Sequence, residues 1–236
     1  MNLITTMIID DERLAREELK NLTAKWDKIQ IIGEAENAFE AKKMINQHQP
    51  DLIFLDIEMP QKNGFQLLEE LDNVPLVIFV TAYDQYAIQA FDVSALDYIV
   101  KPIRTERFDK CIQKAIAQLQ NSPNEKKQTK QQIFIKDANK CYFIKLDEIS
   151  YIKSIGNYAQ LHFNGKSAMV KRSLNYLEET LPDYFFRCNR SEIINHHFIE
   201  EIRPLFKGAL QVQLSTNHVI DLSDRKAVVF KEQLKL

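Results

Sequence analysis

The chain has 236 residues, of which 45% are hydrophobic and 27% charged, and its formal net charge is -2. This composition is ordinary for a soluble globular protein of one or two domains, and it requires no unusual structural class. No apolar run approaches the roughly 20 residues of a membrane span, and residues 1–9 lack the basic flank of a signal peptide. We therefore expect a cytoplasmic protein that does not contact a membrane.

The small net charge hides an uneven distribution along the chain. Residues 1–121 hold 13 Lys and Arg against 20 Asp and Glu, a net -7, whereas residues 122–236 hold 18 against 13, a net +5. This split favours a first half that tolerates cations and a second half that can meet phosphate groups, although a few excess lysines are usually only a solvated surface.

The three cysteines, Cys111, Cys141 and Cys188, are odd in number and widely spaced, and no CxxC motif occurs. This pattern indicates neither a disulfide framework nor a zinc site. We expect small buried thiols in a reducing cytoplasm.

Residues 1–120 alternate short apolar runs with amphipathic stretches. The expected strands are residues 7–9, 29–33, 52–55, 76–80 and 98–100. The expected helices are residues 12–24, 38–47, 64–71, 86–91 and 106–119. Strands that alternate with helices predict right-handed crossovers and a parallel sheet covered on both faces. The sequence therefore predicts a doubly wound, flavodoxin-like α/β domain.

Residues 51–60 run from an apolar strand directly into a carboxylate. The four apolar residues before Asp56 are typical of a central parallel strand that is buried on both faces. Pro60 ends this run because proline donates no ladder hydrogen bond. Asp56 is thus expected at the carboxyl end of a central strand, where open parallel sheets bind ligands. For this stretch alone, an Asp that caps the next turn remains an alternative.

Two further carboxylates are expected to join Asp56 at the same edge of the sheet. Asp10 and Asp11 follow the first strand, and three carboxylates so close together repel one another unless a cation neutralises them. Mg²⁺ suits such oxygen ligands. Thr81 and Lys101 stand at the ends of the fourth and fifth strands, and a hydroxyl and an ammonium facing a metal-bound aspartate suit phosphoryl transfer.

This ordered set, Asp10-Asp11, Asp56, Thr81-Ala82 and Lys101-Pro102, resembles the receiver domain of two-component response regulators over residues 1–120. The resemblance implies that a sensor histidine kinase phosphorylates Asp56. It also implies that Asp11 and Asp56 bind Mg²⁺ directly, that Asp10 assists, and that the backbone of Glu58 supplies a carbonyl ligand. In the same resemblance Lys101 holds the phosphoryl group, and Thr81 and Tyr98 form the switch pair.

A rival interpretation of the acidic cluster is a Mg²⁺-dependent phosphatase with an aspartyl nucleophile. Such enzymes resemble one another in a second acidic residue two positions after the nucleophile, and Glu58 occupies that place. The threonine and the valine-rich segment that follow in those enzymes are missing. We expect a protein that is not an enzyme apart from phosphoryl transfer onto its own aspartate.

Residues 121–131 are polar and contain a proline, which predicts a linker between a domain at 1–120 and a second domain at 132–236. From residue 132 the apolar pattern changes to a period of two, with β-rich runs separated by turn residues. The expected strands are residues 133–135, 141–146, 149–152, 158–163, 198–202 and 210–214, and the expected helices are residues 173–180 and 224–234. The second domain is therefore predicted to be mostly antiparallel β.

The segments Ile149-Ser-Tyr-Ile-Lys-Ser-Ile-Gly-Asn-Tyr158 and Phe185-Phe-Arg-Cys-Asn-Arg-Ser191 resemble the LytTR-type DNA-binding domain, over residues 133–236. In that family loops rather than a recognition helix meet duplex DNA. Carried onto this chain, the resemblance implies DNA contacts at Asn157, Tyr158, Arg190 and Arg225, with Lys207 as a phosphate contact. Asp224 departs from the neutral or basic residue expected beside Arg225, and it equally suits a helix N-terminus.

Together these resemblances imply a transcription factor that dimerises when it is phosphorylated. Two alternatives remain. The β module could be a protein-interaction domain that does not bind DNA, and Arg190 could pair with Glu192 or another acid to support the fold. The salt dependence of DNA binding would separate the first alternative from DNA recognition.

Overall fold

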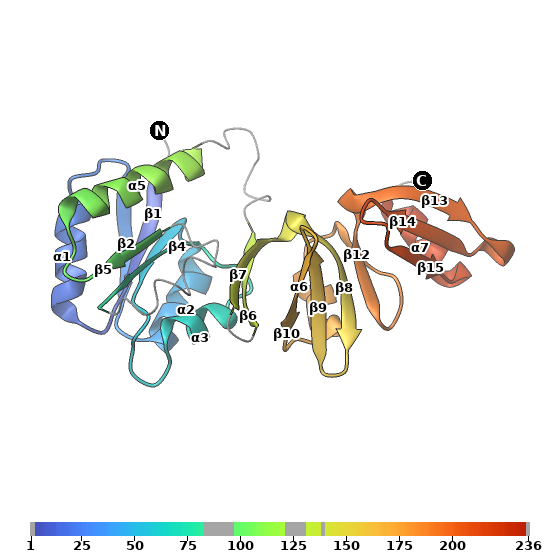
Figure 1. Cartoon of the computed structure of the whole chain (residues 1–236), viewed down its shortest axis with the longest axis horizontal. Coiled ribbons are helices and arrows are strands. Elements are labelled where there is room, and N and C mark those ends of the chain that lie inside the picture. Colours follow the sequence, from blue (N-terminus) through green and yellow to red (C-terminus); the bar gives the residue numbers. More distant parts are fainter. Residues whose placement is uncertain (1–2, 83–96, 121–130, 138–139, 235–236) are drawn as a thin grey trace. The chain divides into compact units, whose positions relative to one another are not determined.

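The computed structural model of the chain describes residues 3–82, 97–120, 131–137 and 140–234. It divides into two compact units, Met1–Ile144 and Lys145–Leu236, which are drawn in Figure 1. The expected helix at residues 86–91 and all but the last residue of the expected linker at residues 121–131 lie outside the described residues. None of the described helices is both long enough and apolar enough to cross a membrane.

Within the described residues, the first unit is built on five parallel strands in the order β2-β1-β3-β4-β5. The strands are β1 (Ile4–Ile9), β2 (Ile29–Ala35), β3 (Leu52–Leu55), β4 (Leu76–Thr81) and β5 (Asp97–Val100). Every residue of β3 and β4 is buried, as the apolar run before Asp56 predicts for central strands. The predicted flavodoxin-like α/β fold is confirmed.

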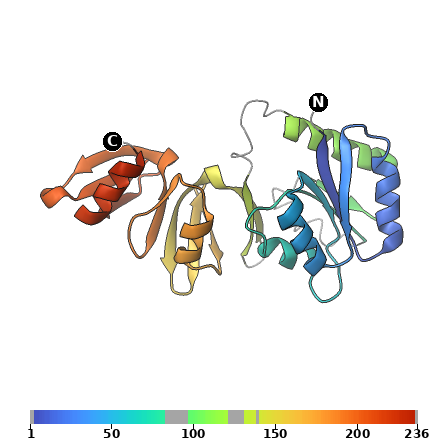
Figure 2. The same ribbon diagram turned by 180° about the vertical axis from the view of Figure 1, so that it is seen from behind.

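Helices cover both faces of this sheet (Figure 2). α1 (Arg13–Thr23) and α5 (Thr105–Gln120) contribute to one apolar cluster, and α2 (Ala38–His48) and α3 (Gly64–Glu69) contribute to the other. The start of α3 is fixed locally, because Asn63 and Gln66 form a reciprocal capping box. This places α3 immediately after the loop that carries Asp56.

The two-stranded sheet of β6 (Gln132–Asp137) and β7 (Lys140–Lys145) packs with the first unit. Its residues Phe134 and Phe143 share an apolar cluster with α3 and β4. The expected domain boundary at residue 132 thus differs from the division after Ile144. The later division follows from aromatic packing, which a strand pattern in the sequence does not reveal.

The second unit contains two antiparallel sheets, in the orders β10-β9-β8-β12-β11 and β13-β14-β15. Their strands are β8 (Ile149–Ile155), β9 (Tyr158–Phe163), β10 (Lys166–Val170), β11 (Phe185–Arg187), β12 (Glu192–Asn195), β13 (Ile199–Pro204), β14 (Leu210–Leu214) and β15 (Val219–Leu222). The helices are α6 (Leu174–Thr180) and α7 (Asp224–Leu234). The predicted mostly antiparallel β architecture is confirmed.

All three cysteines are free and buried, as the sequence predicts. Burial raises the pKa of the Cys111 and Cys188 thiols to about 12. A thiol is a poor nucleophile when protonated, so neither has the character of a reactive cysteine.

Candidate acidic site and arginine-lined pocket

Three carboxylates converge at the carboxyl edge of the parallel sheet. The ligand oxygens of Asp10, Asp11 and Asp56 lie within 4.8 Å of one another. The register of β1 against β3 brings them together, because Ile9 pairs with Leu55 and the Asp56 N–H donates to the Ile9 carbonyl at 2.8 Å. Asp10 and Asp56 are buried and Asp11 is exposed. The predicted convergence of the three carboxylates is present.

Lys101 joins the two buried carboxylates. Its Nζ lies 2.8 Å from Asp10 Oδ2 and 2.8 Å from Asp56 Oδ2, and 3.4 Å from Glu12 Oε2. Burial on its own would lower the pKa of Lys101, but its hydrogen bonds to Asp10 and Asp56 outweigh burial and raise that pKa. Lys101 is therefore a permanent cation between the two acids. A cis peptide bond follows it, to Pro102.

Backbone N–H groups hold the other carboxylate oxygens. Glu12 donates to Asp10 Oδ1 at 2.9 Å, and Glu58 donates to Asp56 Oδ1 at 3.2 Å. Burial raises the pKa of Asp10 despite Lys101 and the Glu12 N–H, which act in the opposite direction. The site thus has one oxygen of each buried acid fixed by the backbone and the other turned toward Lys101.

Thr81 and Tyr98 lie on adjacent strands of the same sheet. Thr81 ends β4 and is fully buried, and its hydroxyl has no hydrogen-bond partner among the residues that the structure describes. The Lys101 N–H donates to the Thr81 carbonyl at 2.8 Å, so the strand ends that carry Thr81 and Lys101 are joined. Tyr98 is also buried, and in the register it pairs with Phe79, two residues before Thr81.

The donor set at this edge fits a Mg²⁺ ion. Its side-chain ligands would all be carboxylate oxygens, the hard donors that Mg²⁺ prefers. Asp11 is exposed, which keeps the site open to solvent, and Mg²⁺ usually retains several waters. Asp10, Asp11 and Asp56 are the residues that could hold the ion, as the sequence indicates.

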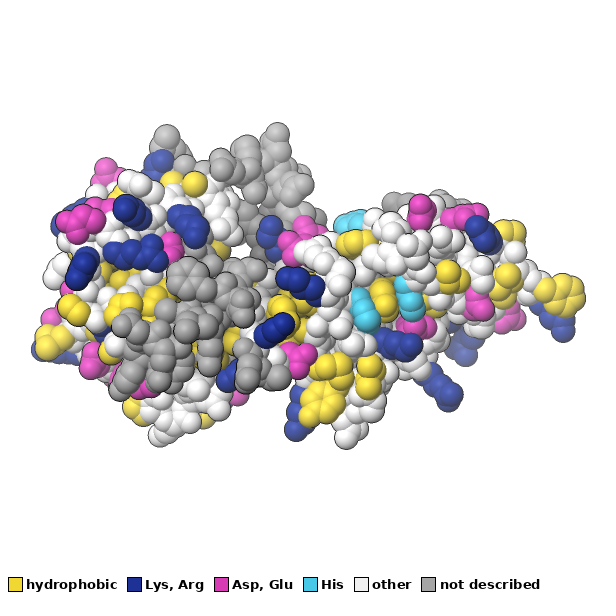
Figure 3. Space-filling view, viewed as in Figure 1, with side chains coloured by type: hydrophobic (Ala, Val, Ile, Leu, Met, Phe, Trp, Pro, Cys, Tyr) yellow, Lys and Arg dark blue, Asp and Glu magenta, His cyan; other side chains and the backbone are white. Residues whose placement is uncertain are grey.

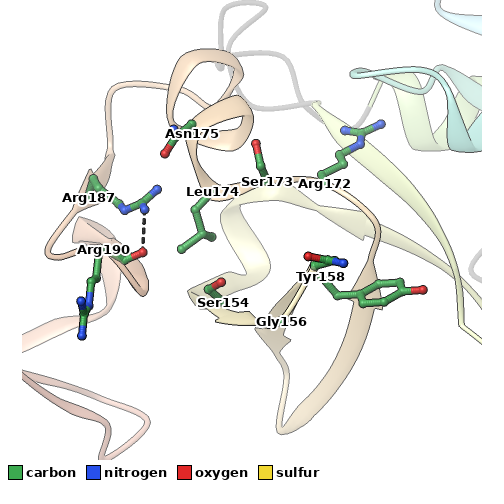
Figure 4. Close-up of a pocket in the computed structure, with 10 residues that line it drawn as sticks. Ser154, Gly156, Tyr158, Arg172, Ser173, Leu174, Asn175, Arg187 and Arg190 are labelled. Atoms are coloured by element: carbon green, nitrogen blue, oxygen red, sulfur yellow. Dashed lines mark hydrogen bonds between the residues drawn. The ribbon is translucent and has the colours of Figure 1, made fainter.

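The second unit has an arginine-lined pocket of about 320 Å³ between the loops that follow β8, β10 and β11 (Figure 4). Three of the predicted DNA contacts, Asn157, Tyr158 and Arg190, line it. Arg172 and Arg187 line it as well, and sequence reasoning missed both. On the face drawn in Figure 3, further Lys and Arg side chains project along one edge of the second unit.

Arg187 fixes the loop that carries Arg190. Its Nε donates to the Asn189 carbonyl at 2.5 Å and its Nη2 donates to the Arg190 carbonyl at 2.8 Å, the bond dashed in Figure 4. The Arg187 side chain is only 11% exposed. The side chain of Arg190 instead extends outward from the loop (Figure 4). Arg187 is therefore a positioning residue, and Arg190 is free to meet a ligand.

Glu192, the expected alternative partner of Arg190, is engaged elsewhere. Its Oε1 lies 3.1 Å from His218 Nε2, and its Oε2 accepts a hydrogen bond from Asn189 at 3.1 Å. Arg190 forms no ion pair with any residue in the described part of the chain. The geometry does not favour the alternative in which Arg190 supports the fold through Glu192.

Lys207 and Arg225 do not line this pocket. Lys207 lies in the exposed turn between β13 and β14, with φ of 59° and its ammonium 5.7 Å from the centre of the Phe206 ring. Arg225 is exposed in the first turn of α7, next to Asp224, which is the acidic residue of that turn. The structure thus groups three of the five predicted DNA contacts and leaves the other two elsewhere on the second unit.

A flavodoxin-like sheet that ends in three carboxylates, a lysine and a buried threonine defines the class of receiver domains. The family description "Response regulator receiver domain" matches residues 6–113, and "LytTr DNA-binding domain" matches residues 139–235. The chain therefore belongs to the response regulators that combine a receiver with a LytTR DNA-binding domain.

Curated relatives are similar over nearly their whole length. An uncharacterized response regulatory protein of Vibrio cholerae is 37% identical over 98% of this chain and 99% of that protein. The sensory transduction protein LytT of Enterococcus faecalis is 34% identical over 98% of both chains. The transcriptional regulatory protein BtsR of Salmonella typhi is 32% identical over 99% of this chain and 100% of that protein.

Proposed function

We propose that this protein is a cytoplasmic transcription factor that a sensor histidine kinase phosphorylates on Asp56. The observation that carries the proposal is the paired contact of Lys101 with Asp10 and Asp56 at the end of β3. A buried carboxylate that already faces a cation can accept a phosphoryl group, because the same cation then faces the incoming phosphoryl oxygens.

In the proposed step an oxygen of Asp56 attacks phosphorus while the bond from phosphorus to the donor atom breaks, and the donor leaves with the electron pair of that bond. The Glu58 N–H orients the Asp56 carboxylate through its Oδ1. Lys101 compensates charge on the phosphoryl oxygens. Mg²⁺, held by Asp10, Asp11, Asp56 and the backbone carbonyl of Glu58, would supply further compensation of that charge.

Thr81 and Tyr98 would form the switch. A phosphoryl group adds about -1.5 to -2 charges and three acceptor oxygens. The Thr81 hydroxyl, buried without a described partner, is suited to donate to one of them. Reorganisation around Thr81 and Tyr98 would then favour a homodimer.

The second unit would bind duplex DNA through the arginine-lined pocket. Asn157, Tyr158 and Arg190 would meet bases or backbone there, while Lys207 and Arg225 would add contacts from the other loops. Arginine can grip guanine through two hydrogen bonds or bridge phosphates, whereas lysine mainly supplies charge. The second candidate function is a protein-interaction domain that does not bind DNA. A pocket lined by three arginines favours DNA binding over this candidate.

The phosphorylation step is tested with acetyl phosphate and Mg²⁺ on the full chain, followed by intact mass. We expect a single phosphoryl group on the wild type and none on Asp56→Asn. Asp51→Asn is the matched control, because Asp51 is an exposed acid at the opposite end of β3. Labelling that persists in Asp56→Asn rejects the assignment.

DNA binding is tested by recovering genomic fragments with the purified protein and titrating a recovered duplex at several salt concentrations. Contacts with phosphates release counterions, so the logarithm of the affinity should fall linearly with the logarithm of the salt concentration. A partner domain that does not use DNA would recover no enriched sequence.

A further inference from the structure

The β6–β7 hairpin is assigned differently by the family match and by its packing. The match to the DNA-binding domain begins at residue 139 and so includes β7, whereas the compact receiver unit extends to Ile144. Strand β7 is therefore sequence of the DNA-binding domain that packs, together with β6, as part of the receiver unit.

Aromatic side chains make this contact. Phe134 stacks on Phe65 of α3 with ring centroids 6.0 Å apart and planes 10° apart. Phe143 meets the edge of Phe79 of β4 at 6.4 Å, and it also packs on Phe134 at 5.0 Å. Phe65 and Phe79 are themselves 5.2 Å apart. The four rings form one buried cluster, and such ring pairs contribute beyond their buried area.

Backbone hydrogen bonds fix the register of the hairpin against the receiver. The Val74 N–H donates to the Gln132 carbonyl at 2.8 Å, and the Gln132 side-chain amide donates to the Pro75 carbonyl at 2.9 Å. Gln132 N–H in turn donates to Asn73 Oδ1 at 3.3 Å. These bonds tie the first residue of β6 to the segment that leads into β4. In both ribbon views β6 lies beside α3.

Strand β6 is buried on both of its faces. Ile133, Phe134 and Ile135 are consecutive residues of β6, and each is at most 5% exposed. Successive side chains of a strand point to opposite faces. Phe134 and Phe143 belong to the receiver cluster, whereas Ile133 and Ile135 are not among its described members.

The receiver surface that contacts the hairpin is connected to Asp56 through two elements, α3 and β4. Gly64 precedes Phe65, and a Cβ on Gly64 would lie 2.5 Å from the Asp56 carbonyl oxygen. Phe79 pairs in register with Leu55, the residue before Asp56. Any movement of the Asp56 backbone must therefore displace the start of α3 or β4, and with them the rings that hold the hairpin.

We propose that the Phe65–Phe79 surface of the receiver is a docking site for the chain's own β6–β7 hairpin, and that this hairpin transmits the change at Asp56 to the DNA-binding domain. The second half of this statement rests on the proposed phosphorylation of Asp56. Docking itself does not, so the two can be tested separately.

Docking is tested without a phosphodonor, by hydrogen exchange of the full chain. Phe143→Ala should speed exchange of the α3 and β4 amides at least tenfold, because the ring that covers Phe79 is removed. Lys140→Ala is the matched control, since this side chain is exposed and lies on the same strand β7. Gln132→Ala, which leaves no cavity in the aromatic cluster, should have the same effect on a smaller scale. Wild-type exchange of α3 and β4 in both Phe143→Ala and Gln132→Ala overturns the docking site.

Transmission is tested on the same proteins with acetyl phosphate and Mg²⁺. Labelling should change exchange of residues 132–145 at least threefold in the wild type. It should also change DNA affinity, and the ratio of labelled to unlabelled affinity should fall toward 1 in Gln132→Ala but not in Lys140→Ala. Unchanged hairpin exchange in protein that mass shows to be labelled overturns transmission and leaves the proposed function standing. Absence of labelling overturns both the proposed function and transmission. Docking is then decided by the hydrogen exchange of Phe143→Ala and Gln132→Ala alone.

Discussion

Gly64 lies so close to Asp56 that no larger residue fits without displacing the backbone. A Cβ on Gly64 would be 2.5 Å from the Asp56 carbonyl oxygen and 3.2 Å from Ile57 Cα, and the Gly64 N–H donates to the Ile57 carbonyl at 2.8 Å. Helix α3, which follows Asp56, is therefore packed directly onto the Asp56 backbone.

Gly64→Ala should destabilise the receiver and disturb Asp56 together. The added methyl group meets backbone atoms that cannot rotate away, and overpacking of this kind typically costs about 1 to 3 kcal/mol. Urea unfolding should show a lower midpoint, and labelling by acetyl phosphate should slow.

Gly33→Ala provides the control for this substitution. Its Cβ would also be 2.5 Å from another atom, but that atom is the terminal methyl group of Met44, which can rotate away. The loss of stability should be distinctly smaller and labelling unchanged. Equal losses in the two variants would mean that the backbone contact with Asp56 has no special consequence.

Lys101→Ala should leave two buried carboxylates without their shared cation. Breaking a buried ion pair by removing one partner typically costs about 3 to 5 kcal/mol, and Lys101 is only 14% exposed. Urea unfolding without Mg²⁺ should reveal most of this loss, and added Mg²⁺ should restore part of it by neutralising Asp10 and Asp56.

Lys42→Ala is the matched control, because Lys42 pairs with Glu70 at 3.2 Å and the two side chains are 40% and 38% exposed. Such surface pairs are typically worth about 0 to 1 kcal/mol. If Lys101→Ala were no less stable than Lys42→Ala at low Mg²⁺, the buried contacts of Lys101 would not hold the site together.

The receiver fold and the members of its acidic site follow from the sequence because each depends on local patterns. Leu52–Leu55 is a continuous apolar run, and the polar residues that follow the strands must meet at one sheet edge once the sheet is parallel. Burial of Thr81 without a described partner is different. This burial depends on the neighbouring strands. The sequence therefore predicts a threonine at the end of β4 but not the surroundings of its hydroxyl.

In the second unit, short strands escaped prediction because they do not alternate clearly. β11 has three residues and β12 four, and buried residues are adjacent in both. β10 was missed as well, and so was β15, although burial alternates along its four residues. The expected strand at 198–202 begins at Ile199 instead. Asn195 accepts a hydrogen bond from the His197 N–H at 2.9 Å and sustains a 3-10 turn through Phe198.

The arginine-lined pocket could be predicted only in part. Asn157, Tyr158 and Arg190 came from motifs, whereas Arg172 belongs to the basic pair before α6 and has no pattern that assigns it to the same pocket. Arg187 acts through backbone carbonyls, which carry no sequence signal. Tertiary folding alone brings the three loops together.

Arg190→Ala should flatten the preference for a cognate duplex over a mismatched one. Its side chain extends from a fixed loop and has no described ion-pair partner, so it is available to a base edge. Loss of one good base contact typically costs about 1 to 3 kcal/mol of discrimination. Lys207→Ala, if it touches only phosphate, should instead weaken all duplexes about equally and reduce the salt slope by about 1.

Competition titrations with matched and mismatched duplexes, paired with thermal melts, decide the role of Arg190. Full sequence preference in a destabilised Arg190→Ala protein would assign that residue to the fold and not to DNA.

Arg187→Lys should weaken DNA binding although it keeps the charge. The guanidinium donates from Nε to the Asn189 carbonyl and from Nη2 to the Arg190 carbonyl. A single ammonium on a flexible stem cannot reproduce this planar fork. Hydrogen bonds to a charged group are typically worth about 1.5 to 3 kcal/mol each, so the loop should loosen and both affinity and thermal stability should fall.

Arg172→Lys is the control that separates the effect of charge in the pocket from the effect of loop positioning by Arg187. Arg172 lies over the Tyr176 ring at 5.6 Å, away from the loop of residues 187–191, so its replacement should leave that loop in place. Fluorescence titration of a cognate duplex should give a clearly larger loss for Arg187→Lys than for Arg172→Lys, and exchange of the Asn189 and Arg190 amides should speed only in the former. Equal losses, with loop exchange unchanged, would show that Arg187 contributes charge alone and does not position Arg190.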